Sequence, residues 1–277
     1  MIETYTYTDV LPESVLNRYT IMETGSAAKI ADAVCRDEFA EVCDVLSAFS
    51  LTSRLLLTRG GSRGPVPRII DEAFEHLGWT EARVDLFKRA YYFPGQNAST
   101  VKDDPLGERA NKACISEVYQ QGYSVDNVKG RIALDVEWNP KDGNLDRDFS
   151  AYRAWHEEGL IDVAILVTRV HEESRDITDM CWSKFIEAHP EYASEKQTVE
   201  YRTTTTANYE KARERVLRGD LGTCPILVLG IGQATWDWEP WDGMMVRYDS
   251  KGGNMYLAHA FDDSVPSQPY PFIRITN

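Results

Sequence analysis

Apolar residues recur at helical spacing in the first part of the chain. Ser26 is predicted to cap a helix that runs to about Ser50. Its apolar positions are Ile30, Val34, Phe39, Val42, Leu46 and Phe49. A second helix is predicted with Pro67 in its first turn and Gly78 as its C-terminal stop. The spacing predicts two more helices, over Thr80–Phe93 and from about Glu108 to Gln121.

From Tyr123 onward the pattern predicts strands as well as helices. Strands are expected over Tyr123–Val128 and Arg131–Trp138, joined by a tight turn at Lys129 and Gly130. The remaining expected elements are a helix over Leu145–Glu158 ended by Gly159, a buried strand over Leu160–Val170, a helix over Ala207–Leu217 closed by Gly219, and a buried strand over Pro225–Ile231. This alternation indicates an α/β fold, with a mixed sheet flanked by helices.

Acidic residues gather on one face of the predicted hairpin. The apolar residues of its second strand are Ile132, Leu134, Val136 and Trp138, so Asp135 and Glu137 share the opposite face. With the turn at Lys129 and Gly130, Val128 pairs with Arg131 and Asp126 pairs with Ala133. Asp126 then lies on the same face as Asp135 and diagonal to it, so three carboxylates converge.

Carboxylates this close repel one another unless a cation neutralises them. Oxygen ligands with few fixed protein contacts suit Mg²⁺, which shares its coordination shell with phosphate. We therefore expect Asp126 and Asp135 to hold the metal while Glu137 orients or deprotonates the water that attacks a phosphodiester. Mn²⁺ is expected to substitute for Mg²⁺. The alternative is a solvated strand face on which Arg131 compensates the acids.

Composition fits a globular protein, whereas the net charge does not by itself favour nucleic acid. The 277 residues are 43% hydrophobic and 27% charged, and the formal net charge is −14. DNA affinity depends on phosphate neutralisation and normally needs a basic surface. Local charge differs from this total, because the segment Leu51–Ile70 holds Arg54, Arg59, Arg63 and Arg68 without any acidic residue.

The cysteines and the apolar runs point to a cytoplasmic protein without a membrane segment. Five scattered cysteines with no CxxC spacing argue against a disulfide framework and a zinc cluster. The apolar runs, such as Val163–Val167, are far too short to span a bilayer. The five histidines show no ligand spacing either.

The acidic residues also carry a family resemblance. Val125-Asp126, followed after eight residues by Asp135-Val136-Glu137, resembles the PD-(D/E)xK nuclease motif. The surrounding stretch, Tyr123–Val170, is similar to the corresponding region of the type II restriction endonucleases of the BglII, BstYI and BamHI group. Val125 replaces the proline of the motif, and Glu137 stands where the wider superfamily usually has lysine. BamHI is similar in having glutamate there, and the BglII group has glutamine.

The resemblance implies a restriction-endonuclease-like fold and a homodimer that cuts double-stranded DNA at a specific short sequence with Mg²⁺. We expect one elaborated domain over 1–277, with a nuclease core at about 107–233 and an N-terminal helical part at about 26–93. The residues carried over are Asp126, Asp135 and Glu137. A shifted site using Glu137 and Asn139 stays open, and Glu117 on its predicted helix is a further candidate. Expected DNA contacts are Arg59, Arg63, Lys141 and Arg147.

Two other functions remain as alternatives. A nuclease-like protein that binds DNA without cutting it would agree with the acidic charge and the missing lysine. A serine hydrolase would use Ser62, since Gly60–Gly64 matches GxSxG. Pro65 and Pro67 disfavour it, because they impose extended geometry where a nucleophile elbow leads straight into a helix.

Overall fold

The computed structural model describes residues 2–57, 64–92, 113–141, 143–194, 206–238, 244–248 and 255–259. Its helices are α1 (Tyr7–Val10), α2 (Glu13–Leu16), α3 (Ala27–Val34), α4 (Arg36–Ala48), α5 (Ser53–Leu57), α6 (Pro65–His76), α7 (Gly143–Glu157), α8 (His171–Ala188) and α9 (Tyr209–Arg218), with 3-10 turns η1 (Pro190–Tyr192) and η3 (Gln233–Thr235). Its strands are β1 (Glu3–Thr4), β2 (Tyr19–Thr24), β3 (Thr80–Arg83), β4 (Leu86–Tyr92), β5 (Ala113–Gln120), β6 (Ser124–Lys129), β7 (Ile132–Glu137), β8 (Val163–Arg169), β9 (Ile226–Ile231), β10 (Met244–Tyr248) and β11 (Met255–His259).

The chain forms two compact units. The larger unit comprises Met1–Ala82 and Val125–Asn277, and the smaller one is Arg83–Ser124. The smaller unit holds the antiparallel pair β4 and β5. The division into one domain with a nuclease core and an N-terminal part stays a prediction.

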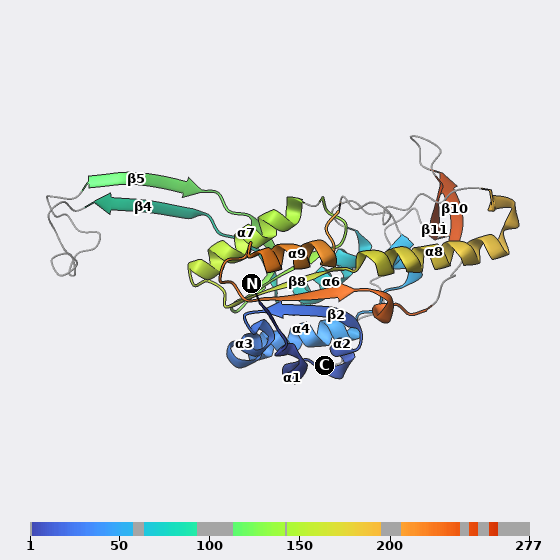
Figure 1. Ribbon diagram of the computed structural model, residues 1–277, viewed down its shortest axis with the longest axis horizontal. Helices are drawn as coiled ribbons and strands as arrows, with labels where there is room; N and C mark the ends of the chain where they lie inside the picture. Colours follow the sequence, from blue (N-terminus) through green and yellow to red (C-terminus); the bar gives the residue numbers. More distant parts are fainter. Residues whose placement is uncertain are drawn as a thin grey trace. The chain divides into compact units, whose positions relative to one another are not determined.

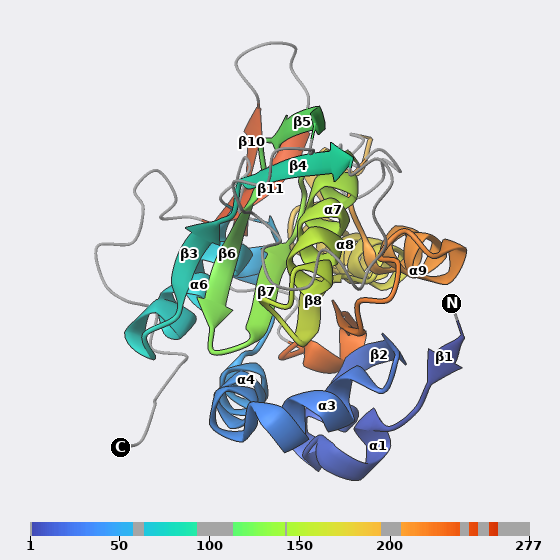
Figure 2. The same cartoon turned by 90° about the vertical axis from the view of Figure 1, so that its left-hand side faces the viewer.

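A seven-stranded sheet organises the larger unit, in the order β1-β2-β9-β8-β7-β6-β3. β7, β8 and β9 run parallel, whereas β2 and β6 pair antiparallel to their neighbours β9 and β7. Figure 2 shows β3, β6, β7 and β8 side by side in that order. In Figure 1, α7 and α9 lie on one side of the sheet and α3 and α4 on the other. The predicted mixed sheet flanked by helices is confirmed.

The apolar pattern of the central strands accounts for their place in the sheet. Every residue of β8 and of β9 is buried, as expected for parallel strands covered on both faces. The alternating residues Ile132, Leu134 and Val136 of β7 join the main hydrophobic core with helices α4 and α6. The opposite face of β7 lies against α7, so it is covered rather than open to solvent.

The predicted hairpin of β6 and β7 is present, but its register is shifted. Lys129 pairs with Ile132 and Val128 with Ala133, so the turn residues are Gly130 and Arg131. Gly130 has φ 55°, the left-handed conformation that glycine adopts easily. Lys129 belongs to the strand, where it pairs with Ile132, and its ammonium group binds Glu41 Oε1 at 2.7 Å.

The predicted helix from Ser26 to about Ser50 is two helices, α3 and α4. The chain breaks at Cys35, which has φ −137° and ψ 49°. Ser26 does not cap α3 with its side chain and has φ 57°. The apolar spacing continues across the break because both helices bury residues in the same core, and the periodicity therefore hides the break.

The helices predicted over Thr80–Phe93 and from about Glu108 to Gln121 are wrong, and the helical part expected at about 26–93 therefore ends with α6. The chain forms β3, β4 and β5 there. Phe87 on β4 pairs with Tyr119 on β5, and an aromatic pair of this kind favours strands. The sequence interpretation also did not include β2 and α8.

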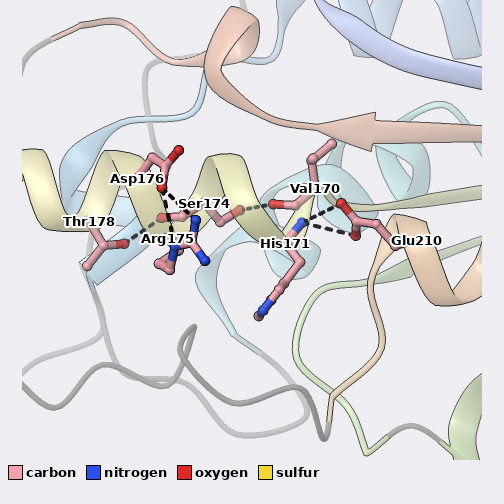
Figure 3. A network of polar contacts seen from close by, with 7 residues as sticks. All are labelled: Val170, His171, Ser174, Arg175, Asp176, Thr178 and Glu210. Carbon is pink, nitrogen blue, oxygen red and sulfur yellow. Dashed lines mark hydrogen bonds and ion pairs between the residues drawn. The ribbon is translucent and has the colours of Figure 1, made fainter.

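Helix α8 begins with a cap that another helix provides. No side chain at the N-cap residue Val170 satisfies the first backbone N–H groups. Instead, the N–H of His171 donates to both carboxylate oxygens of Glu210 on α9, each at 3.2 Å (Figure 3). The hydroxyl of Ser174 donates to the carbonyl of Val170 at 2.7 Å, and Thr178 repeats this bond one turn later. α9 therefore fixes the start of α8.

A buried arginine joins the carboxyl ends of β7 and β8. Arg169 is 0% exposed, and its guanidinium donates to Trp138 O at 3.1 Å and to Asn139 Oδ1 at 3.1 Å. It also donates to Thr206 Oγ1 at 2.7 Å. These bonds hold the segment that follows β7 against the end of β8.

Arg169→Met should lower the free energy of unfolding by about 3 kcal/mol, because it leaves several buried acceptors without a donor. Denaturant titration of the purified protein measures this loss. Arg153→Met is the matched control, since Arg153 pairs with Glu157 at 2.8 Å on the exposed side of α7. It should cost about 0.5 kcal/mol or less. Equal losses for the two variants would show that Arg169 is not an anchor.

Candidate active site

The β6–β7 hairpin brings two carboxylates next to each other. Extension of the observed register by one residue places Asp126 opposite Asp135, where the sequence analysis expected Ala133. The backbone N–H of Asp126 donates to Asp135 Oδ1 at 2.7 Å. The predicted pairing was therefore two residues out of register. A register shift of two residues leaves every side chain on the same face of the sheet. The prediction that both carboxylates share one face is therefore confirmed.

Asp135 is held inside the protein by hydrogen bonds to both of its oxygens. Asp135 is 3% exposed. The backbone N–H of Asp126 donates to its Oδ1, and the hydroxyl of Tyr152 on α7 donates to its Oδ2 at 2.5 Å. Burial, together with the negative charge of Asp126, raises the pKa of Asp135 to about 8. Burial likewise raises the pKa of the Tyr152 phenol well above its ordinary value, so the hydroxyl keeps its proton and donates it to Asp135.

Glu137 and Asp148 form a second carboxyl pair. Their side chains share a hydrogen bond, and burial raises the pKa of both. The charges of Asp135 and Glu137 also raise the pKa of Asp148. Asp148 Oδ2 is buried and has no hydrogen-bond partner among the described residues. An acidic oxygen in this position is satisfied when a cation or its water reaches it.

The acidic face is not a solvated surface balanced by Arg131. The guanidinium of Arg131 instead binds Asp162 at 2.6 Å. Arg147 contributes positive charge here, because its guanidinium lowers the pKa of both Glu137 and Asp148. Asp126 is the exposed member of the group. The carboxylates therefore run from an exposed position on β6 to buried positions under α7.

This donor set fits a divalent cation that needs few protein ligands. In the part of the chain that the structure describes, no three His, Cys, Asp or Glu side chains already stand in a metal-holding arrangement. Mg²⁺ is commonly bound through one or two carboxylates, with waters and substrate phosphates completing its shell. Asp126 and Asp135 are the pair that would hold such an ion, and Asp148 Oδ2, which no described residue binds, lies among the same acidic groups.

The model of the family described as restriction endonuclease BglII/BglIII matches residues 19–231. The chain belongs to this family. The matched range begins with the first residue of β2 and ends with the last residue of β9. The protein is thus a site-specific deoxyribonuclease that binds double-stranded DNA and hydrolyses phosphodiester bonds. The serine hydrolase and the non-cleaving DNA-binding protein are set aside for this reason.

The curated proteins contain no match to the endonuclease. Among its described residues, no helix has both the length and the apolar content required to cross a bilayer.

The other predicted residues of the endonuclease fall in several places. Arg59, Ser62 and Arg63 lie outside the described residues. Lys141 and Arg147 are exposed, the first in a bridge with Thr206 and the second on α7. Glu117 was a candidate on a predicted helix, but it lies on β5, where its carboxylate binds Arg89 at 2.9 Å.

The shifted site through Asn139 receives no support from the geometry. Asn139 lies beyond the end of β7, and its Oδ1 accepts the hydrogen bond from Arg169. This oxygen is thus engaged with the buried arginine. Asp135 remains the carboxylate that lies beside Asp126.

Two residues of this site were missed from the sequence, Asp148 and Tyr152. The helical spacing of α7 buries Leu145 and Phe149 together with them. From the sequence, this segment was used only to predict a helix. The signal for Asp148 was its charge, because a carboxyl group on the buried face of a helix needs a partner.

The raised pKa of Asp135 predicts how stability depends on pH without metal. The folded protein keeps a proton that an unfolded Asp loses near pH about 4, so this stabilisation is complete below that pH. It is lost as the pH rises through about 8. In EDTA the free energy of unfolding should therefore fall from about pH 5 to about pH 8 more steeply in the wild type than in Asp135→Asn. Parallel curves from denaturant titration would show that Asp135 titrates normally.

Proposed function

We propose that the endonuclease cuts DNA with Mg²⁺ held by Asp126 and Asp135, and with Glu137 acting on the attacking water. The observation that carries this proposal is the contact of Asp126 with Asp135, whose backbone N–H and carboxylate oxygen are 2.7 Å apart. Asp135 has little other reason to be buried, since burial raises its pKa and costs free energy. A bound cation offsets that cost.

Each carboxylate has a separate part in the proposed reaction. The metal, when bound, stabilises negative charge on the phosphate and lowers the pKa of water. Asp126, which is exposed, faces the solvent from which DNA approaches. Asp135 is fixed by its two hydrogen bonds. Glu137 accepts the proton of the attacking water, and burial brings its pKa closer to neutral, where a general base is most effective.

Positive side chains near the site would hold the DNA backbone. Arg147 is exposed on α7, and its charge reaches Glu137 and Asp148. Lys141 is exposed close to the end of β7. We assign both to the phosphates near the cut. Arg59 and Arg63 remain proposed contacts from the sequence pattern, which is basic in this segment of an acidic chain.

We also propose that the endonuclease acts as a homodimer in the cytoplasm, with Mn²⁺ able to replace Mg²⁺. The two strands of a palindromic DNA site are related by twofold symmetry, and a twofold dimer presents one set of carboxylates to each strand. Sedimentation or light scattering of the protein with a cognate duplex measures this. A monomer bound to the duplex would contradict the dimer.

The direct test of function is cleavage of DNA that contains many sequences, such as a set of plasmids and bacterial genomic DNA with and without methylation. With Mg²⁺, discrete fragments are expected, and with EDTA none. The sequences at the fragment ends then give the recognition site and the stagger. Cleavage that proceeds equally in EDTA would overturn the metal dependence, whereas intact DNA throughout would overturn the activity.

Asp126→Asn and Asp135→Asn should each slow cleavage by on the order of a thousandfold or more, because each removes a ligand charge from the metal. Single-turnover cleavage of a cognate duplex measures this. Both variants should fold, since the loss of one charge relieves repulsion in the cluster. Asp146→Asn is a suitable control, because Asp146 binds Arg215 at 2.7 Å on the exposed side of α7. If both variants cleave at wild-type rate while folded, the assigned site is wrong.

Glu137→Gln and Glu137→Ala separate two roles of this side chain. Gln keeps an oxygen that orients water but cannot take its proton, so partial activity is expected, whereas Ala removes both functions. The ratio of the two single-turnover rates, measured over a range of pH, gives the contribution of orientation. Equal rates for the two variants would assign Glu137 to proton transfer alone.

A further inference from the structure

Tyr152 has a part in this site that the three carboxylates do not explain. Its side chain is 0% exposed, and its hydroxyl donates to Asp135 Oδ2 at 2.5 Å. The same hydroxyl lies 3.4 Å from the carbonyl of Ile165 on β8, which is a much longer contact. The short bond to Asp135 is therefore the main interaction of this hydroxyl.

The two donors to Asp135 come from different elements. The N–H of Asp126 belongs to β6 and is fixed by the sheet, whereas the hydroxyl of Tyr152 belongs to α7. One donor on each oxygen defines the rotation of the carboxylate about its own axis. Every carboxylate oxygen has a second lone pair, so both oxygens can still bind a cation.

We propose that Tyr152 is a positioning residue, which holds Asp135 in the orientation that binds the metal. Through this bond, helix α7 contributes to the geometry of the catalytic centre. This inference rests on the proposed function of Asp135. Side chains that hydrogen-bond to metal ligands fix the orientation of those ligands, and their loss typically weakens metal binding or activity about 10-fold to 100-fold.

The test compares two tyrosines that both lose a buried hydroxyl. Tyr152→Phe removes the bond to Asp135, and Tyr19→Phe removes a bond of 2.7 Å from Tyr19 to the carbonyl of Leu46. Binding of Mn²⁺ to each protein is measured by titration calorimetry without DNA, and cleavage is measured by single-turnover kinetics. Tyr152→Phe should weaken Mn²⁺ binding about 10-fold and slow cleavage. Tyr19→Phe should lose stability but bind Mn²⁺ as the wild type does.

Each outcome supports or overturns the inference. Wild-type Mn²⁺ affinity in Tyr152→Phe overturns it, as does an equal loss in both variants, which would make the effect one of general stability. If the wild type itself binds no Mn²⁺ and cuts no DNA, the proposed function fails and the positioning role fails with it. That result is distinct from a variant that behaves like an active wild type.

A double variant covers the case in which Tyr152→Phe does not fold. Adding Asp135→Asn replaces the buried carboxylate by a neutral amide, which needs the phenol much less. If Tyr152 acts through Asp135, the double variant should be more stable than Tyr152→Phe alone, and thermal unfolding in EDTA measures this. If the double variant is as unstable as the single one, the phenol serves packing and the positioning role is wrong.

Discussion

Everything at the active site depends on the retention of one carboxylate, Asp135, on the covered face of the central sheet. Such a group is expensive in a protein interior unless donors or a cation accompany it. The structure provides a backbone N–H from β6 and a phenol from α7, one for each oxygen. The antiparallel register of β6 on β7 and the docking of α7 are thereby linked to the chemistry of a single side chain.

The sequence predicted the parts of this arrangement that follow from local patterns. The spacing of apolar residues and the position of the turn predicted five features: the buried strands β8 and β9, helix α7, the hairpin, and the shared face of Asp126 and Asp135. The family resemblance rested on the same stretch. These features are local because the alternation of a strand fixes the face of each residue whatever its partner is.

Other features were decided by distant residues, and the sequence did not predict them. The turn was predicted one residue too early, and Lys129 instead lies in β6 with its ammonium bound to Glu41 on α4. β4 and β5 become strands by pairing with each other, although spacing alone favoured helices. The covered state of the acidic face was missed for the same reason, because it follows from the docking of α7 and not from the strand that carries the acids.

The negative net charge of the chain is compatible with DNA cleavage. A phosphate and a group of carboxylates repel each other, so an apo-enzyme of this kind is electrostatically unsuited to the last approach of DNA to the site. A divalent cation changes the sign of the interaction at that point alone. Local basic side chains, rather than the total charge, are what the proposed contacts of Arg147 and Lys141 with phosphate would use.

The pairing of β2 with β9 has a consequence for how the chain acquires its structure. Tyr19 lies opposite Ile231, so a strand near the beginning of the sequence completes the sheet against a strand close to its end. During synthesis β2 leaves the ribosome long before its partner exists, and its edge stays unpaired until β9 emerges. Contacts between such distant residues also slow folding, since the intervening loop must close first. The sheet of the larger unit is therefore completed only after residues 226–231 have been made.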